Sequence, residues 1–371
     1  MTDVFVAADN IFSPIGMTTT ENFSQLKAGI SGVRQHQLPA ISDESLYAAL
    51  FEPDRFIPDG PYTKFEQLLL TSIGDALQRS DIDPADGKTI LIVSSTKGNI
   101  SLLETGINDP GKISLPASAR KIANHFHFTH TPIVVSNACI SGVLALLLAK
   151  RLLQSGQYEN AVVAGADVIS RFVLSGFGSF QAISPGPCKP FDAARDGINL
   201  GEGAGTIILS TRQKDQEGIR LSGGSVSNDA NHISGPSRTG DELYQAISRS
   251  LRDAGRTAAE IGFISAHGTA TPYNDEMEAK ALTLADLQSV PVNSLKGYYG
   301  HTLGAAGLIE SIVTLQSMRE DLVLPSRGYE QNGVTRPLNV CSSLLHTPLN
   351  NTLKTASGFG GCNAAVLWSK Q

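Results

Sequence analysis

Strand-like and helix-like patterns of apolar residues alternate along the whole chain, separated by short turns of small or polar residues. Thr63–Arg79 has apolar residues near helical spacing, and the apolar run Thr89–Val93 follows it as a strand. Similar patterns predict strands at Val4–Ala8, Ile133–Val135, Ala161–Ala164, Thr206–Leu209 and Ile261–Ile264, and helices at Thr20–Gly29, Ser141–Leu153, Glu242–Ala254 and Leu303–Met318. Because several strands are apolar throughout, we expect sheets covered by helices on both faces. The alternation predicts an α/β fold.

The second half of the chain repeats the element order of the first. In each half, a helix, a polar turn and a strand that ends in small residues precede a second strand, a second turn and a second helix. This repeat predicts two α/β halves, 1–215 and 216–371, with the boundary in the charged stretch Gln213–Gly218. The segment Gly32–Gly60 holds several prolines, and we expect it to be irregular and at the surface.

Composition and charge exclude several classes of protein. A chain of 371 residues with 41% hydrophobic content can bury a large core. Its net charge is −6 and its Lys and Arg residues are scattered, so no nucleic-acid partner is expected. The four cysteines lack the spacing of a zinc site, which argues against a metal and against a disulfide framework. The N-terminus has no basic region and no apolar run reaches the length of a membrane span, so we expect a cytoplasmic protein without a membrane partner.

Cys139 lies where a predicted buried strand meets a predicted buried helix. The free N–H groups at the start of a helix favour a thiolate, and the small neighbours Ala138 and Gly142 leave room for a substrate. The position suits a nucleophile. An isolated free cysteine is, however, more commonly a small core residue, and this stretch alone leaves both interpretations open.

Three further stretches place histidines, a lysine or glycines in turns. They are SAHGTATPYND with His267, NSLKGYYGHTLGAAGLIE with Lys296 and His301, and SGFGGCN near the C-terminus. Each alone has a structural interpretation, because a histidine after a strand commonly makes structural hydrogen bonds and glycine turns occur throughout proteins. Their combination in one chain is far more specific.

With these motifs the chain resembles the β-ketoacyl-[acyl-carrier-protein] synthases, condensing enzymes of the thiolase superfamily. The matching stretches are Asn137–Cys139, KPFDAARDGINLGEGAG at Lys189–Gly205, and the motifs around His267, His301 and Gly358. The two histidines make the chain most similar to the elongating synthases, since initiating synthases pair the cysteine with one His and one Asn, and thiolases use a second cysteine. The resemblance implies a thiolase-like fold, in which the two duplicated halves form a five-layered αβαβα core.

The resemblance also implies how the site residues act. Cys139 is expected to carry the growing acyl group as a thioester, because a thiolate is a reactive nucleophile. His267 and His301 are expected to donate hydrogen bonds to the charge that forms when malonyl-carrier loses carbon dioxide. Support for the site is expected from Lys296, which pairs with Glu310, and from Asp275.

The glycine turn near the C-terminus is expected to complete the oxyanion hole. By resemblance, the backbone N–H groups of Cys139 and Phe359 hold the tetrahedral oxyanion, while Gly358 and Gly360 let the turn approach and move. Thr269 and Thr271 match positions that bind the pantetheine arm of the substrate, although a purely structural role in their turn is the alternative.

Three features depart from the family pattern. Ile140 follows the nucleophile where a small residue is usual, and Ser357 replaces the first Phe of the usual FGFGG loop. The chain is also shorter than most relatives between Thr96 and Cys139, a region that in the family helps form the dimer contact and the acyl pocket. Acyl length and pathway therefore stay open between fatty-acid elongation and specialised polyketide or polyene synthesis.

The expected activity is a decarboxylative Claisen condensation that yields 3-oxoacyl-[acyl-carrier protein]. No cofactor is expected, since the substrates are carried on the phosphopantetheine of an acyl carrier protein, for which Lys64 is a candidate docking residue. The protein is expected to form a homodimer or a heterodimer with a related synthase subunit. One alternative is a chain-length-determining partner subunit, against which the presence of Cys139 argues. A carrier-binding scaffold with little turnover of its own is a second alternative.

Overall fold

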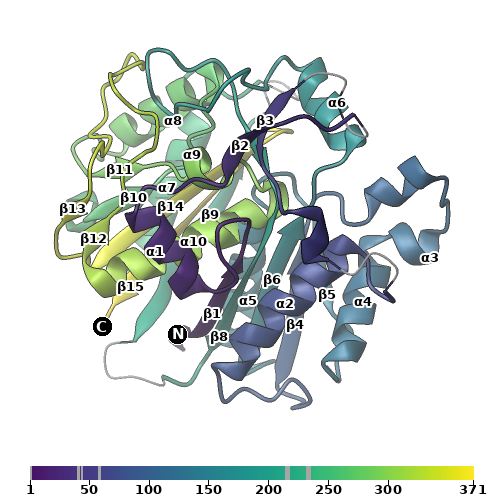
Figure 1. Cartoon of the computed structure of the whole chain (residues 1–371). Helices are drawn as coiled ribbons and strands as arrows, with labels where there is room; N and C mark the ends of the chain where they lie inside the picture. Colours follow the sequence, from purple (N-terminus) through teal and green to yellow (C-terminus); the bar gives the residue numbers. More distant parts are fainter. Residues whose placement is uncertain (1, 40–41, 43–44, 57–59, 214–217, 231–234) are drawn as a thin grey trace.

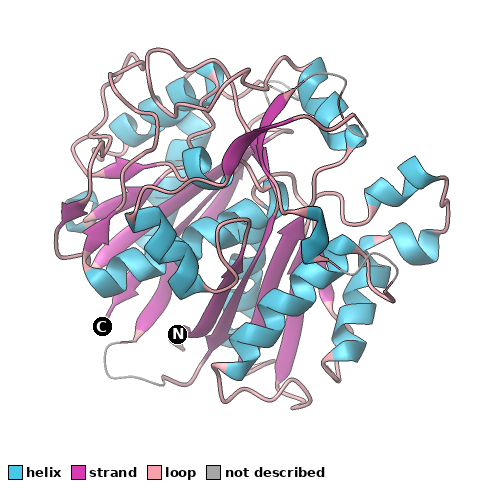
Figure 2. Cartoon of the chain, viewed as in Figure 1, coloured by secondary structure: helices cyan, strands magenta, loops and turns pink. Residues whose placement is uncertain are grey.

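Ten of the described strands form one mixed sheet whose two ends repeat the same strand order (Figures 1 and 2). The structure, a computed structural model, describes residues 2–39, 42, 45–56, 60–213, 218–230 and 235–371. The N-terminal half has, from the centre outward, β1 (Phe5–Phe12), β8 (Gly203–Ser210), β6 (Asn160–Asp167), β4 (Thr89–Ser94) and β5 (Ile133–Val135). The C-terminal half has, in the same direction, β9 (Ile219–Asn228), β15 (Cys362–Lys370), β14 (Asn351–Gly358), β10 (Phe263–Ser265) and β11 (Val292–Asn293).

The two halves match in strand direction as well as in order. β4 runs parallel to β5 and β6, and β10 runs parallel to β11 and β14. The other neighbours within each half are antiparallel, and the halves meet where Phe5 of β1 pairs with Arg220 of β9. This equivalence confirms the duplicated α/β halves. The predicted boundary between residues 215 and 216 lies outside the described residues, so the division into domains 1–215 and 216–371 stays a prediction.

Helices cover both faces of each half of the sheet and create the five layers (Figure 1). α5 and α10 form the central layer, because α5 contacts β4 and β6 on one side and β9 and β15 on the other, while α10 contacts β8 and β14. The outer layers are α2 with α4 on the N-terminal half and α7 with α8 on the C-terminal half. Their bounds are α2 Lys64–Gln78, α4 Leu115–His125, α5 Ser141–Gln154, α7 Asp241–Ala254, α8 Pro272–Leu284 and α10 Ala306–Glu320. The expected αβαβα core is thus confirmed.

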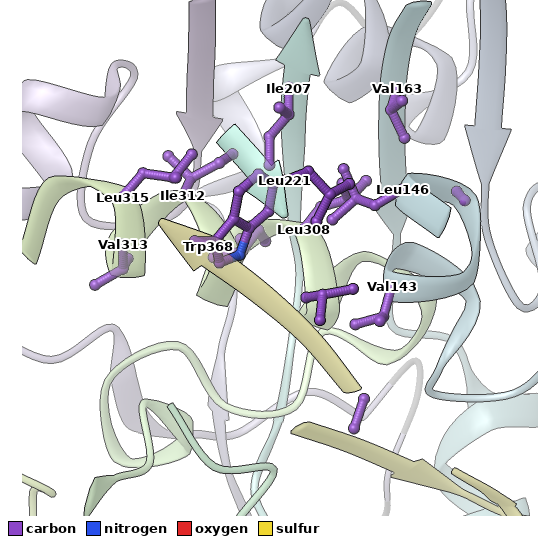
Figure 3. Packing of buried hydrophobic residues seen from close by; sticks show 14 of the residues in the cluster. Val143, Leu146, Val163, Ile207, Leu221, Leu308, Ile312, Val313, Leu315 and Trp368 are labelled. Carbon is purple, nitrogen blue, oxygen red and sulfur yellow. The ribbon is translucent and has the colours of Figure 1, made fainter. Parts of the chain in front are cut away.

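The central layer is largely buried. Twelve of the fifteen residues of α10 are buried, and every residue of β6 and β8 is buried as well. Figure 3 shows Val143 of α5 and Leu308 of α10 in the same apolar cluster as Trp368 of β15. The two helices cross closely because Gly142 has no side chain: a Cβ atom there would lie 2.9 Å from the backbone nitrogen of Leu308.

The smaller elements lie around this core. The helices are α1 (Thr19–Lys27), α3 (Pro110–Ile113), α6 (Arg171–Ser179), α9 (Lys296–Tyr299), and the 3-10 turns η1 (Pro53–Arg55), η2 (Ile100–Thr105), η3 (Ala258–Glu260) and η4 (Leu303–Ala305). The strands are β2 (Val33–His36), β3 (Leu46–Ala49) and β7 (Leu200–Gly201) in one small sheet, and β12 (Leu322–Val323) with β13 (Leu345–His346) in another. No described helix has the length and apolar character needed to cross a membrane, and the cytoplasmic location stays a prediction.

The prediction for Gly32–Gly60 was wrong in part. β2 and β3 pair within this segment, and Leu46, Ala48 and Ala49 are buried. The strand β3 forms because it also pairs in parallel with β7, which is distant along the chain, so the local sequence gives no sign of it.

Several predicted boundaries shift by a few residues. α1 begins at Thr19 instead of Thr20, because Thr18 caps it by accepting a hydrogen bond from Glu21 N. The last predicted helix starts as the 3-10 turn η4, and α10 itself begins at Ala306. β10 begins at Phe263, two residues after the predicted start. α2 matches its predicted span, with Thr63 forming a capping box.

Replacing Gly142 with Ala should lower the free energy of unfolding by about 1–3 kcal/mol, because the new methyl group meets backbone atoms that cannot move aside freely. Gly176→Ala is the matched control: Gly176 is exposed in α6 and nothing lies within 4 Å of a Cβ atom there. This second substitution should be neutral or stabilising. Urea denaturation of both variants measures the difference, and equal stabilities would show that the helix crossing tolerates a methyl group.

Candidate active site

Cys139 lies in the tight turn between β5 and α5 and lines a cavity of about 500 Å³. Ala138 before it has φ 43°, a left-handed conformation that costs a non-glycine residue about 1–3 kcal/mol. Two hydrogen bonds hold this turn: the hydroxyl of Ser141 donates to Ala138 O at 2.6 Å and accepts from Asn137 N at 2.8 Å. The turn presents the cysteine at the cavity while its neighbours are fixed.

The thiol of Cys139 is protonated in this environment. Burial raises its pKa to about 12, and the nearby Cys362 acts in the same direction. α5 begins only at Ser141, two residues after Cys139, and burial has the largest effect on the pKa of the thiol. The nucleophile needs a proton acceptor.

His301 Nε2 lies 3.0 Å from the Sγ of Cys139, close enough to accept the thiol proton when that nitrogen carries none. The ring of His267 stands nearly perpendicular to that of His301, with ring centres 5.2 Å apart. Burial lowers the pKa of both imidazoles well below the usual 6.5, and the ammonium of Lys296 lowers each pKa further. The resting site therefore holds a thiol and two neutral imidazoles, as the three predicted side chains come together.

Backbone contacts fix both histidines. His267 follows β10, and its N–H donates to the carboxylate of Glu278 at 2.8 Å, while its carbonyl accepts from Lys296 Nζ at 3.1 Å. His301 is held by Asn199 and Gly201, which bond its N–H at 2.7 Å and its carbonyl at 3.0 Å. The rings are thus anchored through their backbones, and each Nδ1 is buried without a partner among the described residues.

Lys296 and Glu310 form the predicted ion pair beneath the histidines, with the lysine side chain fully buried. Asp275 lies farther from the reacting groups. Its carboxylate accepts from the backbone N–H groups of Phe191 at 2.7 Å and Ala270 at 3.2 Å, and burial raises its pKa to about 7. The contacts of Asp275 suit support of the neighbouring loop.

The turn between β14 and β15 carries Phe359 to the cavity. A Cβ atom at Gly358 would lie 2.9 Å from Cys139 N, so only glycine allows this close approach. Gly360 has φ +85°, a conformation that favours glycine. The backbone N–H of Phe359 favours the thiolate form of Cys139, and the Phe359 ring packs against Phe177 with centres 5.5 Å apart. The site thus draws on both halves of the chain.

The remaining predicted residues also lie at the cavity, with one exception. Thr269 and Thr271 line it, and their hydroxyls lie 2.8 Å apart. Ser357 lines it too and donates to Asn363 Oδ1 at 2.7 Å. Ile140 is buried in the apolar core and is not among the described cavity residues, so its size affects packing.

The candidate docking residue Lys64 is already engaged. Its Nζ lies 2.6 Å from the carboxylate of Glu202 and over the ring of Phe56. A carrier protein that bound Lys64 would have to compete with these contacts. Lys64 is therefore a poor docking candidate.

Sequence reasoning missed three charged residues that hold the site together. Lys354 of β14 and Glu278 of α8 are fully buried beneath His267. Asp167 at the end of β6 accepts from Ser95 Oγ at 2.7 Å and Gly304 N at 2.6 Å, which ties the N-terminal half to the turn before α10. No clear signal for Lys354 was present in the sequence, because its strand, NTLKTASG, is largely polar.

Cys139, His267 and His301 also offer ligand atoms within 4.8 Å of one another, the spacing of a potential metal site. Among the described residues this group coincides with the proposed catalytic groups. The sequence-based expectation that the protein uses no metal stays a prediction.

Comparison with known families decides the class of the protein. Residues 61–215 match the family model "Beta-ketoacyl synthase, N-terminal domain", and residues 219–330 match "Beta-ketoacyl synthase, C-terminal domain". The chain belongs to the beta-ketoacyl synthase family. The members of this family are acyltransferases that catalyse a condensation, and this beta-ketoacyl synthase is therefore an enzyme.

Individual relatives agree with the family. The beta-ketoacyl synthase is 30% identical to a putative mitochondrial 3-oxoacyl-[acyl-carrier-protein] synthase of Schizosaccharomyces pombe, over 82% of this chain and 81% of the relative. It is 28% identical to 3-oxoacyl-[acyl-carrier-protein] synthase 2 of Vibrio cholerae, over 99% of both chains. Among solved structures, a ketosynthase (ApeO) in complex with its chain length factor (ApeC) from Xenorhabdus doucetiae has a TM-score of 0.90 at 24% identity, covering 100% of this chain and 98% of that one. The structural match confirms the thiolase-like fold.

Alkylation of Cys139 by iodoacetamide should become about tenfold faster with each pH unit between pH 7 and pH 10, because the thiolate fraction keeps rising below a pKa of about 12. Mass spectrometry of the Cys139 peptide measures the rate, and Cys139→Ala provides the blank. A rate that levels off below pH 8 would show instead that the thiolate is already formed near neutral pH.

Proposed function

We propose that this synthase joins an acyl group held on Cys139 to malonyl-[acyl-carrier protein], with loss of carbon dioxide, to give 3-oxoacyl-[acyl-carrier protein]. The observation that carries the proposal is the distance of 3.0 Å between Cys139 Sγ and His301 Nε2 inside a cavity that His267 also lines. A buried thiol has little nucleophilic character by itself, and this contact provides the base that it needs.

In the first half-reaction, the sulfur of Cys139 attacks the carbonyl carbon of the incoming acyl thioester. His301 Nε2 accepts the thiol proton, the new C–S bond forms, and the carrier leaves as a thiol that regains the proton. The backbone N–H groups of Cys139 and Phe359 would hold the oxyanion of the tetrahedral intermediate. The close approach of Gly358 to Cys139 N and the interaction of the Phe359 N–H with the sulfur support this assignment.

In the second half-reaction, the bond between the α-carbon and the carboxylate of the malonyl group breaks, and carbon dioxide leaves. The electron pair moves to the thioester oxygen, where the neutral imidazoles of His267 and His301 would donate hydrogen bonds. His301 donates in the tautomer that carries its proton on Nε2, since the acylated Cys139 no longer offers a proton to that nitrogen. The enolate carbon then attacks the acyl-Cys139 carbonyl, the C–C bond forms and the C–S bond breaks. The sulfur leaves as a thiolate, which takes up one proton from solvent to restore the resting thiol. Burial favours this chemistry, because donors fixed in a site of low dielectric stabilise a developing charge strongly.

The substrates would arrive on the phosphopantetheine arm of a carrier protein. Thr269 and Thr271 line the cavity, and we assign them to the arm, with Asp275 supporting their loop through its bond to Ala270 N. Two relatives are named as synthases that act on acyl carrier protein, which supports this choice of carrier. No further cofactor is proposed.

We also propose that the chain works as the catalytic subunit of a dimer. The Xenorhabdus doucetiae structure is named as a ketosynthase with its chain length factor, which makes a heterodimer of related subunits one form and a homodimer the other. The alternative role, a chain-length-determining or scaffold subunit without turnover, would not need the Cys139–His301 contact. Retention of that contact favours the catalytic role.

Intact-mass spectrometry after incubation with acyl-carriers of different length tests the proposed activity. We expect a single acyl adduct that disappears in Cys139→Ala and persists in Cys341→Ala, since Cys341 is buried outside the described cavity lining. Addition of malonyl-carrier should then release the adduct as a longer 3-oxoacyl-carrier. An adduct that survives in Cys139→Ala would overturn the proposal, and an adduct that malonyl-carrier never releases would favour the scaffold alternative.

The two histidines should differ in their effect on the half-reactions. His301 contacts the thiol, so His301→Ala should slow both acyl loading and decarboxylation, whereas His267→Ala should impair mainly decarboxylation. Loss of one such donor costs on the order of 10²- to 10³-fold in rate. Single-turnover assays that follow acyl-enzyme formation and carbon dioxide release separately measure the split. Release of carbon dioxide at the unmodified rate in both variants would remove the pair from this step.

A further inference from the structure

A second buried lysine lies behind the catalytic histidines. Lys354 is in the middle of β14 and its side chain is fully buried. Its Nζ lies 2.8 Å from the carboxylate of Glu310 and donates to the carbonyls of Ser265 at 3.2 Å, Ala266 at 3.2 Å and Thr355 at 2.6 Å. All four partners are acceptors. An ammonium group, which has three N–H donors and no lone pair, suits such surroundings, whereas a neutral amine would face them with its lone pair.

The contacts of Lys354 join the two segments that carry the reacting groups of the C-terminal half. Ser265 and Ala266 are the last residues before His267, and Thr355 belongs to the strand that leads to the Phe359 turn. Lys354 therefore fixes the backbone of His267 relative to that turn. Lys296 makes the neighbouring contact, since it donates to the carbonyl of His267 itself.

Glu310 is shared by both lysines. It pairs with Lys296 through one carboxylate oxygen and with Lys354 through the other. A second carboxylate, Glu278, balances the extra cation: it accepts from His267 N and Gly268 N at 2.8 Å each, and from the hydroxyl of Thr355 at 2.5 Å. Two cations and two anions thus form one buried network under the histidines.

We propose that Lys354 is a positioning residue of the condensation reaction: it fixes His267 against the Phe359 turn, and its charge adds to that of Lys296 in keeping both histidines neutral. The inference rests on the proposed function, because it assigns Lys354 a part in that same reaction. Lys354 itself touches none of the reacting groups in the described site. It acts through the backbone carbonyls and through its charge.

The direction of the charge effect follows from the groups around the histidines. These groups are Cys139 before α5, Asp167 of β6, Asp275 and Glu278 of α8, Lys296 of α9, Glu310 of α10, and Lys354 of β14. After burial and Lys296, the ammonium of Lys354 lowers the pKa of His301 further, and it also lowers that of His267. Removal of Lys354 should therefore raise both histidine pKa values, so that the histidines become protonated and inactive at a higher pH.

Three variants distinguish the effect of Lys354 on the position of His267 from the effect of its charge. Lys354→Met removes the charge and the donors, and we expect the condensation rate at pH 7 to fall about tenfold to a hundredfold, since small displacements of reacting groups have effects of this size. We also expect the acidic limb of its pH–rate profile to move up by about one pH unit. Lys354→Arg keeps the charge, so its condensation rate should fall without a shift of the acidic limb.

Lys150→Met is the matched control. Lys150 is another buried lysine, its Nζ lies 2.6 Å from the carboxylate of Asp253, and it does not line the described cavity.

Histidine titration provides a readout that does not need activity. The ring resonances of His267 and His301, assigned with the corresponding alanine variants, should titrate at higher pH in Lys354→Met than in Lys150→Met or the unmodified protein. Lys354→Gln, which keeps one amide donor for the carbonyls and also lacks the charge, should show the same shift and replaces Lys354→Met if that variant does not fold. If acylation of Cys139 failed while the titrations still moved, the proposed function would fall, and only the effect of the Lys354 charge on the two histidines would stand. An unchanged titration with an unchanged acidic limb in both neutral variants would overturn the inference.

Discussion

The close crossing of α5 and α10 in the central layer is the constraint on which the active site depends. Cys139 lies just before α5 and His301 just before the turn that opens α10, so the distance between them follows from how near the two helices approach. Gly142 permits that approach by leaving room for the backbone of α10. The two halves of the large sheet pack on either side of this crossing, so the two helices cannot move apart easily. A contact between two residues separated by more than a hundred positions is thereby fixed by backbone packing.

Burial has two opposite effects on the chemistry. It makes the thiol of Cys139 a poor nucleophile by itself, since an isolated thiolate is costly in these surroundings. The same burial keeps both imidazoles neutral, so that one can accept the thiol proton and both can offer N–H groups to a developing oxyanion. Reactivity therefore appears only when proton transfer and bond formation occur together, which protects the nucleophile between turnovers.

Much of the architecture was predictable from apolar patterns, and most of the remainder depended on distant contacts. The strands β6 and β8 and the helix α2 are buried along their predicted faces, because their own sequences specify this burial. β3 was missed because its partner β7 lies far along the chain. The predicted site residues Cys139, His267 and His301 meet as expected, whereas Lys354 was missed because nothing local shows that its charge is compensated. The raised pKa of Cys139 could not be predicted for a related reason, since desolvation is a property of the folded surroundings.

Because the two halves have the same fold, residues of the active site occupy equivalent positions in the two halves. β5 followed by α5 in the first half is equivalent to β11 followed by α10 in the second, because the strands hold corresponding places in the sheet. Cys139 and His301 therefore lie at equivalent corners that face each other across the pseudo-twofold axis. Two identical units related in this way would present the same side chain to itself, a cysteine to a cysteine or a histidine to a histidine. Joining the units in one polypeptide allows the corners to diverge, so that one holds the proposed nucleophile and the other its proposed base.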